Sequence, residues 1–380
     1  MSPDAMVGLD PTAAALAPPP LPPLPANLLT RSLLGELVER VHRQAETLDW
    51  SRWFWGEGVL LGALDSSARA LGRPTPELVT RYFEQHPVDA ITIDHVNSLA
   101  PGATSARLGH RGTCERLLAW LESPSALTRA SNGAVEHWPG GVWADTVYMM
   151  GTFLLEAASL LARPDLARRA AEQWLLHTDL LQLANGLAVH GSHRGEVIAC
   201  HWGRANAWIA LAGCAVLEHP DTLPEQREQV HERLTRQLAA FRASLPEGRL
   251  WDVLMDGHPE TRGIVETSAA AGLCASMLRA AALGIDPDAN RKCATQALLR
   301  LVPYVDSDGV LTQTSAGTVL QLVPFGYSVI RADHVQLWGQ GLLLHALAAA
   351  LVHLDLPDQP LPQQPQEAPR TQGITSSEKE

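Results

Sequence analysis

A carboxylate close to a tryptophan begins one of the apolar segments of the chain. In Trp143-Ala-Asp145-Thr-Val-Tyr148, Asp145 stands at the start of a run that continues as an apolar helix. An aspartate in this position is favoured by the helix dipole. A carboxyl group beside an indole at the mouth of a pocket can also have a raised pKa, which suits proton transfer. Asp145 is therefore a candidate helix cap and a candidate general acid/base.

Two tryptophans, an arginine and an asparagine crowd into the segment Trp202-Gly-Arg204-Ala-Asn206-Ala-Trp208, with only small residues between them. A guanidinium group offers a planar fork that matches a carboxylate. The flat face of an indole can stack on a sugar ring. The segment predicts a binding site for an acidic sugar, and its alternative is an Arg–Trp stack with a buried ion pair.

Histidines form a further candidate group. His190-Gly-Ser-His193 follows a Gly/Leu-rich stretch in which a loop is expected. Even with His201, the spacing matches no strong zinc pattern, so sugar or proton contacts are favoured over a metal. We expect neither a metal nor another cofactor. His137 and His334 stand in comparable loops ahead of apolar helices and are candidates for sugar contacts.

A second carboxylate stands in Asp94-His95-Val-Asn97, ahead of another small-residue helix. Asp94 is a candidate to assist Asp145 and is equally well placed to cap its own helix.

Six such segments recur along the chain, each with a polar or aromatic start that leads into a helix of small and apolar residues. They begin at Trp55, Val96, Trp143, Trp202, Glu266 and Trp338. Helices with small residues all round should be buried, while the amphipathic helices between them should lie outside. The alternation predicts an all-α (α/α)6 barrel of six inner and six outer helices, whose polar starts gather at one end. Residues 310–323 are the best candidate for a short strand.

The domain limits follow from composition. Residues 29–353 are expected to form a single barrel domain, since no linker-like stretch interrupts them. Residues 1–28 are Pro/Ala-rich and residues 354–380 are Pro/Gln-rich, so we expect disordered tails.

Composition also excludes several classes of protein. A net charge of −12 without a block of Lys or Arg argues against nucleic-acid binding. No apolar run is long enough to span a membrane, and the N-terminus makes a poor signal peptide. The 5 cysteines form no CxxC pair, which is typical of reduced thiols in a cytoplasmic protein. The 11 tryptophans exceed the 5 phenylalanines, and several begin the inner helices, where a sugar would stack.

The motifs together resemble the unsaturated glucuronyl and rhamnogalacturonyl hydrolases, glycoside hydrolase families 88 and 105, with the stronger likeness to family 105. W-G-R-A-N-A-W is similar to the W-G-R-G-N-G-W segment of that family, with Ala205 and Ala207 in place of glycines. W-A-D-T-V-Y-M-M is similar to the segment that carries the catalytic aspartate.

The resemblance implies an (α/α)6 barrel that acts on the unsaturated uronic acid left by polysaccharide lyases at a non-reducing end. The implied reaction hydrates the C4–C5 double bond, and the resulting hemiketal collapses to release the aglycone. Asp145 would be the general acid/base, with Asp94 assisting. Arg204 would hold the uronate carboxylate, Trp202 and Trp208 would pack against the sugar, and His137 and His190 would contact hydroxyls.

Three alternatives remain open at this point. A sugar epimerase or isomerase of the same architecture would use paired histidines, for which His190, His193, His201 and His334 are available. An inverting glycosidase would need two carboxyl groups roughly 6.5–9.5 Å apart. A non-catalytic barrel that binds a glycan is the third. The sequence does not determine the oligomeric state.

Overall fold

Helices make up most of the computed structural model, which describes residues 19–123 and 126–360. Six helices have small and apolar residues on nearly every side and are almost wholly buried. They are α2 (Trp55–Ala70), α4 (Ala100–Arg107), α6 (Asp145–Leu161), α8 (Gly203–Glu218), α10 (Thr267–Ala282) and α13 (Leu337–His353). Their starts agree closely with the six predicted segments, and α4 is preceded by the 3-10 helix η4 (Val96–Leu99).

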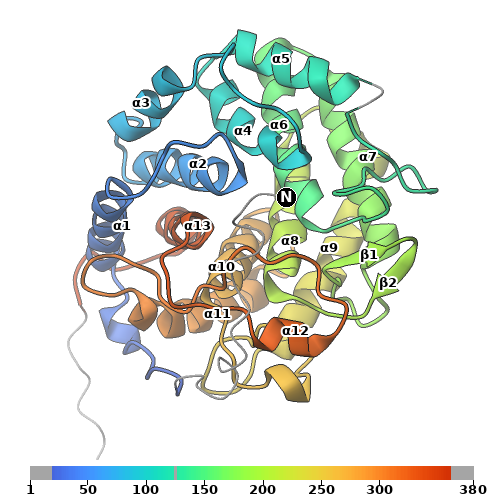
Figure 1. Cartoon of the computed structure of the whole chain (residues 1–380). Coiled ribbons are helices and arrows are strands. Elements are labelled where there is room, and N and C mark those ends of the chain that lie inside the picture. Colours follow the sequence, from blue (N-terminus) through green and yellow to red (C-terminus); the bar gives the residue numbers. More distant parts are fainter. Residues whose placement is uncertain (1–18, 124–125, 361–380) are drawn as a thin grey trace, which may run out of the picture.

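These six helices contact one another in a closed order. Each packs against the next along the chain, and α13 packs against α2 (Figure 1). Six more polar helices lie outside them: α1 (Arg31–Ala45), α3 (Glu77–Gln85), α5 (Arg111–Glu122), α7 (Pro164–Leu181), α9 (Pro224–Ser244) and α11 (Pro287–Leu301). Each outer helix buries an apolar stripe against the inner ones, as α9 does with Val230, Leu234 and Leu238. The loops before the inner helices meet at one end of the ring.

The inner helices approach closely because small residues face one another. A Cβ atom on Gly58 of α2 would stand 2.5 Å from the backbone nitrogen of Pro101 in α4. On Gly272 of α10 it would stand 2.6 Å from the Cβ of Ala207 in α8. Ala207, which departs from the glycine of the similar family, is therefore accommodated by a glycine on the facing helix. Such contacts fix the helix starts relative to one another.

Strand structure among the described residues is limited to one hairpin and several isolated bridges. β1 (Gly191–His193) pairs antiparallel with β2 (Glu196–Ile198), and His193 stands opposite Glu196. The two-residue turn between them places Arg194 and Gly195 at positive φ, as a type I′ turn requires. The prediction of a strand at 310–323 is wrong. This segment is an extended loop with a single bridge, Val305 to Leu311, and its polar groups bind the starts of α8 and α10 instead.

The described parts of the predicted tails, residues 19–28 and 354–360, form backbone hydrogen bonds with the helical body. The 3-10 helix η3 (Ala26–Leu28) follows Leu24, whose backbone N–H donates to the carbonyl of Leu299. At the other end, the N–H of Arg31 donates to the carbonyl of Pro357. The tail predictions for 1–18 and 361–380 lie outside the described residues.

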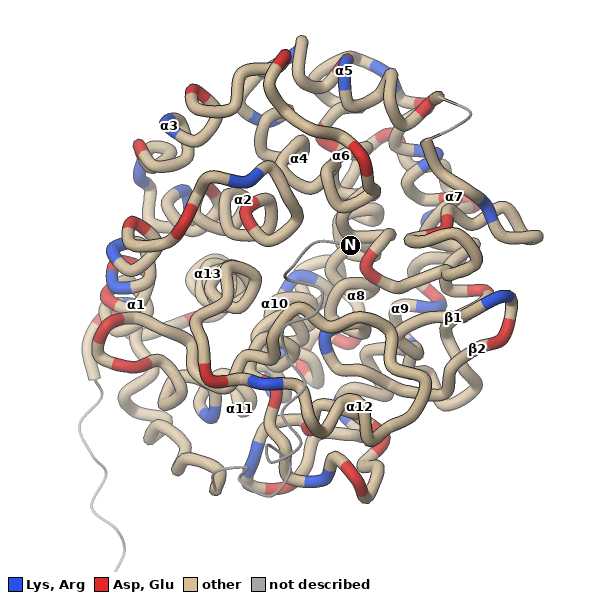
Figure 2. Tube along the Cα trace, in the orientation of Figure 1, with Lys and Arg blue, Asp and Glu red and all other residues tan. Residues whose placement is uncertain are grey.

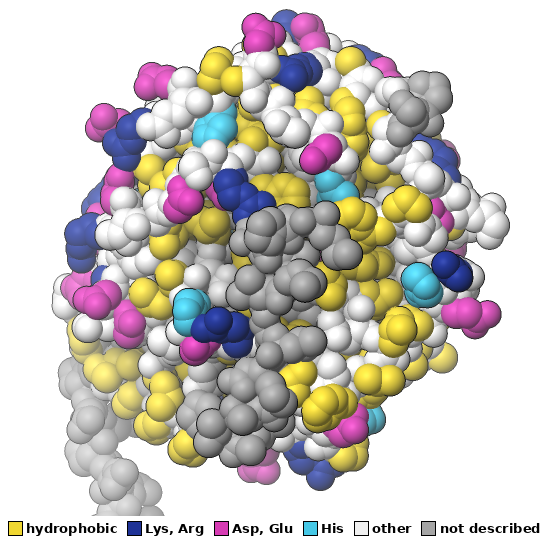
Figure 3. Space-filling model, in the orientation of Figure 1, with side chains coloured by type: hydrophobic (Ala, Val, Ile, Leu, Met, Phe, Trp, Pro, Cys, Tyr) yellow, Lys and Arg dark blue, Asp and Glu magenta, His cyan; other side chains and the backbone are white. Residues whose placement is uncertain are grey.

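Charged residues of both signs alternate around the outside of the molecule (Figure 2). The face toward the viewer also carries hydrophobic side chains (Figure 3). The 3-10 helices η5 (Pro259–Thr261) and η6 (Val302–Tyr304) and the short helix α12 (Pro324–Ser328) complete the elements. In the part of the chain that the structure describes, no helix combines the length and apolar character that crossing a membrane requires.

The contact at Gly58 can be tested by adding one methyl group. Gly58→Ala should lower the free energy of unfolding by about 1–3 kcal/mol, because backbone atoms of α4 must move. Gly35→Ala is the control, since its Cβ would meet only Leu71 at 3.7 Å, and it should gain about 0.5–1 kcal/mol. Urea unfolding measures both variants, and equal stability would contradict the close α2–α4 packing.

Candidate active site

A cavity of about 760 Å³ lies where the inner helices begin. Its wall comes from the segment before α2 and the start of that helix, from η4, from the loop before α6, and from two segments near 317 and 336. Four tryptophans are on this wall: Trp55, Trp138, Trp143 and Trp338. Trp55 and Trp338 stack on each other with ring centroids 4.3 Å apart. The prediction that tryptophans gather at one rim is confirmed for these four.

Asp145 lies on this wall as the first residue of α6, and its side chain is 13% exposed. Nε2 of His190 is 3.4 Å from its Oδ2, within ion-pair distance but without the alignment of a hydrogen bond. The structure thus brings together two of the predicted site residues. A carboxylate facing an imidazole in a largely apolar wall is an arrangement suited to moving a proton.

The position of His190 depends on the glycine that follows it. The N–H of Ala144 donates to the carbonyl of His190, so the chain before α6 runs directly against the segment at 190. A Cβ on Gly191 would stand 2.8 Å from the ring of Trp143 and from the carbonyl of Val142. The His-Gly pair is therefore required by the close approach of these two segments.

A buried tyrosine orients the His190 ring. Nδ1 of His190 is 2.7 Å from the hydroxyl of Tyr327 in α12, which also accepts from the N–H of Gln321. Burial raises the pKa of Tyr327 well above its ordinary value, so the phenol keeps its proton. Nδ1 of His190 therefore faces the phenol, and Nε2 faces Asp145.

The direction of the Asp145 pKa corrects the expectation from sequence. Burial by itself raises the pKa of Asp145, but His190, His137 and Arg204 more than offset it, and the pKa falls below the ordinary value. The prediction of a raised pKa beside tryptophan is therefore wrong. With its pKa below the ordinary value, Asp145 is ionised at neutral pH.

His137 lies on the same wall, in the loop before α6. Its Nδ1 is 2.9 Å from Oγ1 of Thr146, and its ring stacks on Trp143 with centroids 4.6 Å apart. Burial, followed by the neighbouring His95, lowers the pKa of His137 well below its ordinary value. A neutral imidazole in this position can contact a sugar hydroxyl, as predicted for His137.

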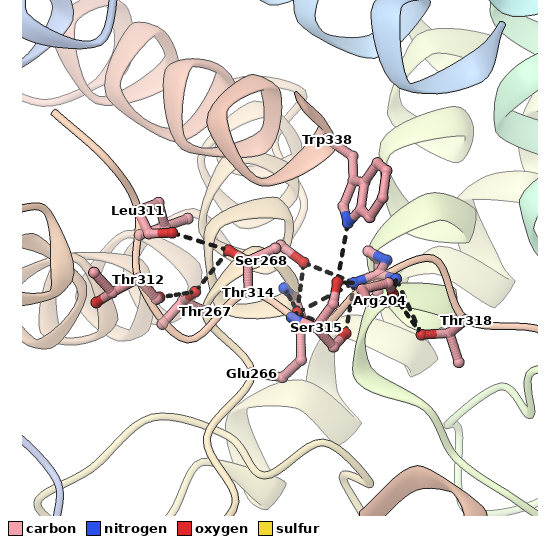
Figure 4. A network of polar contacts seen from close by, with 12 residues as sticks. Arg204, Glu266, Thr267, Ser268, Leu311, Thr312, Thr314, Ser315, Thr318 and Trp338 are labelled. Carbon is pink, nitrogen blue, oxygen red and sulfur yellow. Dashed lines mark hydrogen bonds and ion pairs between the residues drawn. The ribbon is translucent and has the colours of Figure 1, made fainter. Parts of the chain in front are cut away.

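Arg204 is placed differently from the prediction. It is completely buried, and its guanidinium is 4.3 Å from the ring of Trp202. Its two terminal nitrogens bind Glu266 Oε1 at 3.2 Å and five further oxygens (Figure 4), which belong to Ser268, Ser315, Ala316 and Thr318. Arg204 is not on the cavity wall. The guanidinium of Arg204 is bound by groups of the protein itself. The structure therefore contains the Arg–Trp stack with a buried ion pair. These contacts conflict with the predicted role of holding a uronate carboxylate.

Three other residues of this segment also lie behind the wall. Asn206 is buried, and its amide exchanges hydrogen bonds of 2.8 and 2.7 Å with the backbone of Ala188. Trp208 is fully buried against Tyr148, with ring centroids 4.7 Å apart. Trp202 is 1% exposed and packs on His190. These side chains support the site from behind and do not line the cavity as the predicted sugar contacts would.

Two predicted residues lie outside the cavity wall. Asp94 is exposed and accepts a hydrogen bond from the Ser98 hydroxyl at 3.4 Å, while the neighbouring His95 caps η4. His334 is exposed and contacts Asp333 at 3.0 Å, next to a segment that does line the cavity. The structure does not bring either of them to Asp145.

Several polar side chains on the wall were missed as candidate site residues, among them three that are buried or charged. Glu57 is 4% exposed, and Arg52 and Asn97 accompany it. The sequence did indicate Glu57, because it is the one charged residue in the apolar segment Trp55-Gly-Glu57-Gly58. A charged residue in a segment that is expected to be buried is a candidate for a functional role. Oδ1 of Asn97 is buried without a hydrogen-bond partner among the described residues. Such an atom is a natural acceptor for a ligand hydroxyl.

Comparison with known proteins places the chain in a family. The sequence profile of Glycosyl Hydrolase Family 88 matches residues 32–353. The chain belongs to glycosyl hydrolase family 88. The match confirms the resemblance inferred from the Trp143 and Trp202 segments.

Several relatives of this family 88 protein cover most of its length. The unsaturated rhamnogalacturonyl hydrolase YesR of Bacillus subtilis is 25% identical over 336 residues, which are 83% of this chain and 94% of YesR. A structure from Salmonella enterica, described as a possible member of the GH105 family, is 25% identical with a TM-score of 0.76, covering 85% of this chain and 95% of that one.

A third comparison extends the likeness in fold. The unsaturated glucuronyl hydrolase of Bacillus sp. GL1 is 16% identical with a TM-score of 0.58, covering 83% of this chain and 95% of that one. At this identity the likeness concerns the fold alone.

The supporting role of Arg204 has a measurable consequence. Arg204→Gln should lower the free energy of unfolding of this family 88 protein by about 3–5 kcal/mol, because it leaves Glu266 buried without its cation. Arg163→Gln, which breaks an exposed pair with Asp165, should cost less than about 1 kcal/mol. Denaturant unfolding measures both. An Arg204 variant of normal stability would contradict this supporting role.

Proposed function

We propose that this protein is a hydrolase of unsaturated uronides, built on an (α/α)6 barrel. Its substrate would be an oligosaccharide whose non-reducing end carries the unsaturated uronic acid that polysaccharide lyases produce. One observation carries the proposal: Asp145 faces His190 in a tryptophan-lined cavity of a family 88 protein. The relative named as an unsaturated rhamnogalacturonyl hydrolase supports the same substrate class.

The proposed reaction adds water across the C4–C5 double bond. Asp145 gives a proton to C4 and takes one from the water whose oxygen bonds to C5, so the residue ends as it began. The hemiketal at C5 then collapses and releases the aglycone. A substrate carboxylate beside Asp145 raises the pKa of this residue, since a like charge disfavours ionisation. Binding itself therefore favours the protonated form that the first step needs.

The other residues of the wall would hold the sugar. Trp143 offers a ring face that His137 already orients from behind. The stacked pair of Trp55 and Trp338 offers a second aromatic surface. Asn97 contributes an unpaired acceptor for a hydroxyl group. Asp94 has no described contact with the cavity, so in this proposal Asp145 alone does the acid/base work.

The cysteines support a cytoplasmic location, which is part of the proposal. Cys114, Cys200, Cys214, Cys274 and Cys293 are all buried and unpaired. Buried free thiols are typical of proteins that work in a reducing compartment.

Replacing the carboxylate tests the proposal directly. Asp145→Asn should lower kcat on unsaturated oligosaccharides by about 10²–10⁴-fold, because the amide cannot transfer a proton. The measurement is the loss of ultraviolet absorbance of the double bond. Asp94→Asn is the matched comparison and should lose less than about tenfold, since Asp94 is exposed.

The substrate panel should contain lyase products of pectin, glycosaminoglycans and ulvan. If wild-type protein leaves the absorbance of the whole panel unchanged, the proposed function is wrong. If Asp94→Asn is as inactive as Asp145→Asn, the assignment of the two carboxylates is wrong.

A further inference from the structure

His190 lies next to Asp145 but behind the cavity wall. Its side chain is completely buried, and Asp145 lines the cavity while His190 does not. Nε2 of His190 is 3.4 Å from Oδ2 of Asp145. From this position His190 acts on a bound sugar through the carboxylate of Asp145.

The orientation of the His190 ring decides which of its atoms faces Asp145. A half-turn of the imidazole exchanges Nδ1 with Cδ2 and Nε2 with Cε1, with almost no change of shape. After such a turn a C–H group would face the carboxylate in place of Nε2. Packing does not select between two orientations of the same shape, so a polar partner has to select one of them.

Two tryptophans beside His190 hold the plane of its ring. The centroid of the imidazole is 4.3 Å from that of Trp202 and 5.3 Å from that of Trp143. Nε1 of Trp202 has no hydrogen-bond partner among the described residues. The two indoles therefore restrict the tilt of the imidazole without distinguishing its nitrogens from its carbons.

The hydroxyl of Tyr327 does distinguish them. It is 2.7 Å from Nδ1 of His190, and the side chain of Tyr327 is 1% exposed. A buried hydroxyl group is costly unless it has hydrogen-bond partners, and phenylalanine would fill almost the same space without that cost. Burial raises the pKa of Tyr327 well above its ordinary value, so the phenol keeps its proton at neutral pH. The hydroxyl is therefore a constant partner for Nδ1.

The same hydroxyl is bound to the loop that forms part of the cavity wall. It accepts a hydrogen bond from the backbone N–H of Gln321 at 3.4 Å. Residues 316–319 of this loop line the cavity. A Cβ atom on Gly326 would stand 2.5 Å from Oε1 of Gln321, so the glycine allows the loop to approach α12. The loop thus fixes the position of the phenol relative to His190.

We propose that Tyr327 is a positioning residue of the reaction, whose hydroxyl selects the orientation of His190 in which Nε2 faces Asp145. The inference rests on the proposed function and adds to it a residue that does not line the cavity. Asp145 still gives a proton to C4 and takes one from the water that adds to C5. Tyr327 exchanges no proton in these steps and acts through His190 alone.

Removal of the hydroxyl tests the proposal. Tyr327→Phe keeps the ring but removes the partner of Nδ1, so kcat on an unsaturated uronide should fall about 10–10²-fold. KM should change less than about threefold, because no group that contacts the sugar is altered.

Tyr304→Phe is the matched control. Tyr304 is also buried, and its hydroxyl accepts a hydrogen bond from the N–H of Leu21, away from the cavity wall. The control should keep the kcat of the wild type. Equal kcat in Tyr327→Phe and Tyr304→Phe overturns the proposal.

A double variant separates positioning from a general loss of structure. His190→Gln has no imidazole for Tyr327 to orient. If Tyr327 acts through His190, adding Tyr327→Phe to His190→Gln should change kcat less than about twofold. If the two losses of kcat multiply instead, Tyr327 acts independently of His190 and the proposal is wrong.

The pH dependence has a definite sign. Burial raises the pKa of Asp145, and His190 lowers it more than His137 or Arg204 does. Once Nε2 no longer faces Oδ2, the pKa of Asp145 should rise. The limb of the kcat/KM profile that Asp145 produces should therefore lie at higher pH in Tyr327→Phe than in Tyr304→Phe. Identical profiles contradict the proposal.

The neighbouring groups do not produce this difference. The other titratable groups near Asp145 and Tyr327, or on the cavity wall, are His95, His137, His177, Cys200, Arg204, Asp49, Arg52 and Glu57. Burial lowers the pKa of the three histidines and raises that of Cys200, so these four groups are neutral at pH 7. Burial raises the pKa of Glu57 to about 7, and a limb from Glu57 should be the same in both variants.

Nuclear magnetic resonance of isotope-labelled histidine nitrogens tests the link without turnover. The signals of His190 are those that His190→Gln lacks. Both of its nitrogen signals should move in Tyr327→Phe and stay in place in Tyr304→Phe. If the wild type turns over no unsaturated uronide while these signals move, the proposed function fails and the link between Tyr327 and His190 is supported. Signals that do not move in Tyr327→Phe overturn the link.

Discussion

The buried ion pair between Arg204 and Glu266 is the interaction on which the shape of the site depends. It joins the start of α8 to the start of α10, and it binds the loop at 315–318 through several hydrogen bonds (Figure 4). Ala316, Gly317 and Thr318 of this loop form part of the cavity wall. Two buried charges are costly unless hydrogen bonds replace the water that they lose. The Arg204–Glu266 ion pair therefore requires the loop at 315–318 to stay in its present position.

The same reasoning separates the polar side chains of the molecule into two groups. Arg204, Asn206 and Gln340 have partners within the protein, and they hold segments that are distant in sequence against one another. Asn97 has an unpaired acceptor, and Glu57 has a carboxyl group without an ion-pair partner among the described residues. A buried polar group that the protein does not satisfy is a group that a ligand can satisfy. Among the described residues, Asn97 and Asp145 on the cavity wall each have such an atom, and others lie away from the cavity, as in Arg107 and Gln237.

The helical pattern was predictable because it is local. Small residues on every side of α2, α8 and α10 can be recognised in the sequence, and so can the amphipathic helices between them. The strand expected at 310–323 was wrong because its alternation reflects contacts with α8 and α10, which lie far away in sequence. Arg204 and Asn206 were singled out correctly as unusual residues. Their role was misjudged because residue type does not reveal whether a buried guanidinium faces a cavity or a loop.

By itself, the sequence determined the helical class, the six small-residue segments and the family, and it singled out Asp145 as a candidate, since each depends on residue types at short spacing. Only the tertiary structure decided which polar groups have partners. It placed His190 3.4 Å from Asp145 through the close contact at Gly191, and it lowered the pKa of Asp145 where burial alone would raise it. It also brought Glu57 and Arg52 onto the cavity wall and left Arg204 behind it. These outcomes depend on distances between segments that are remote in sequence, and local pattern does not encode such distances.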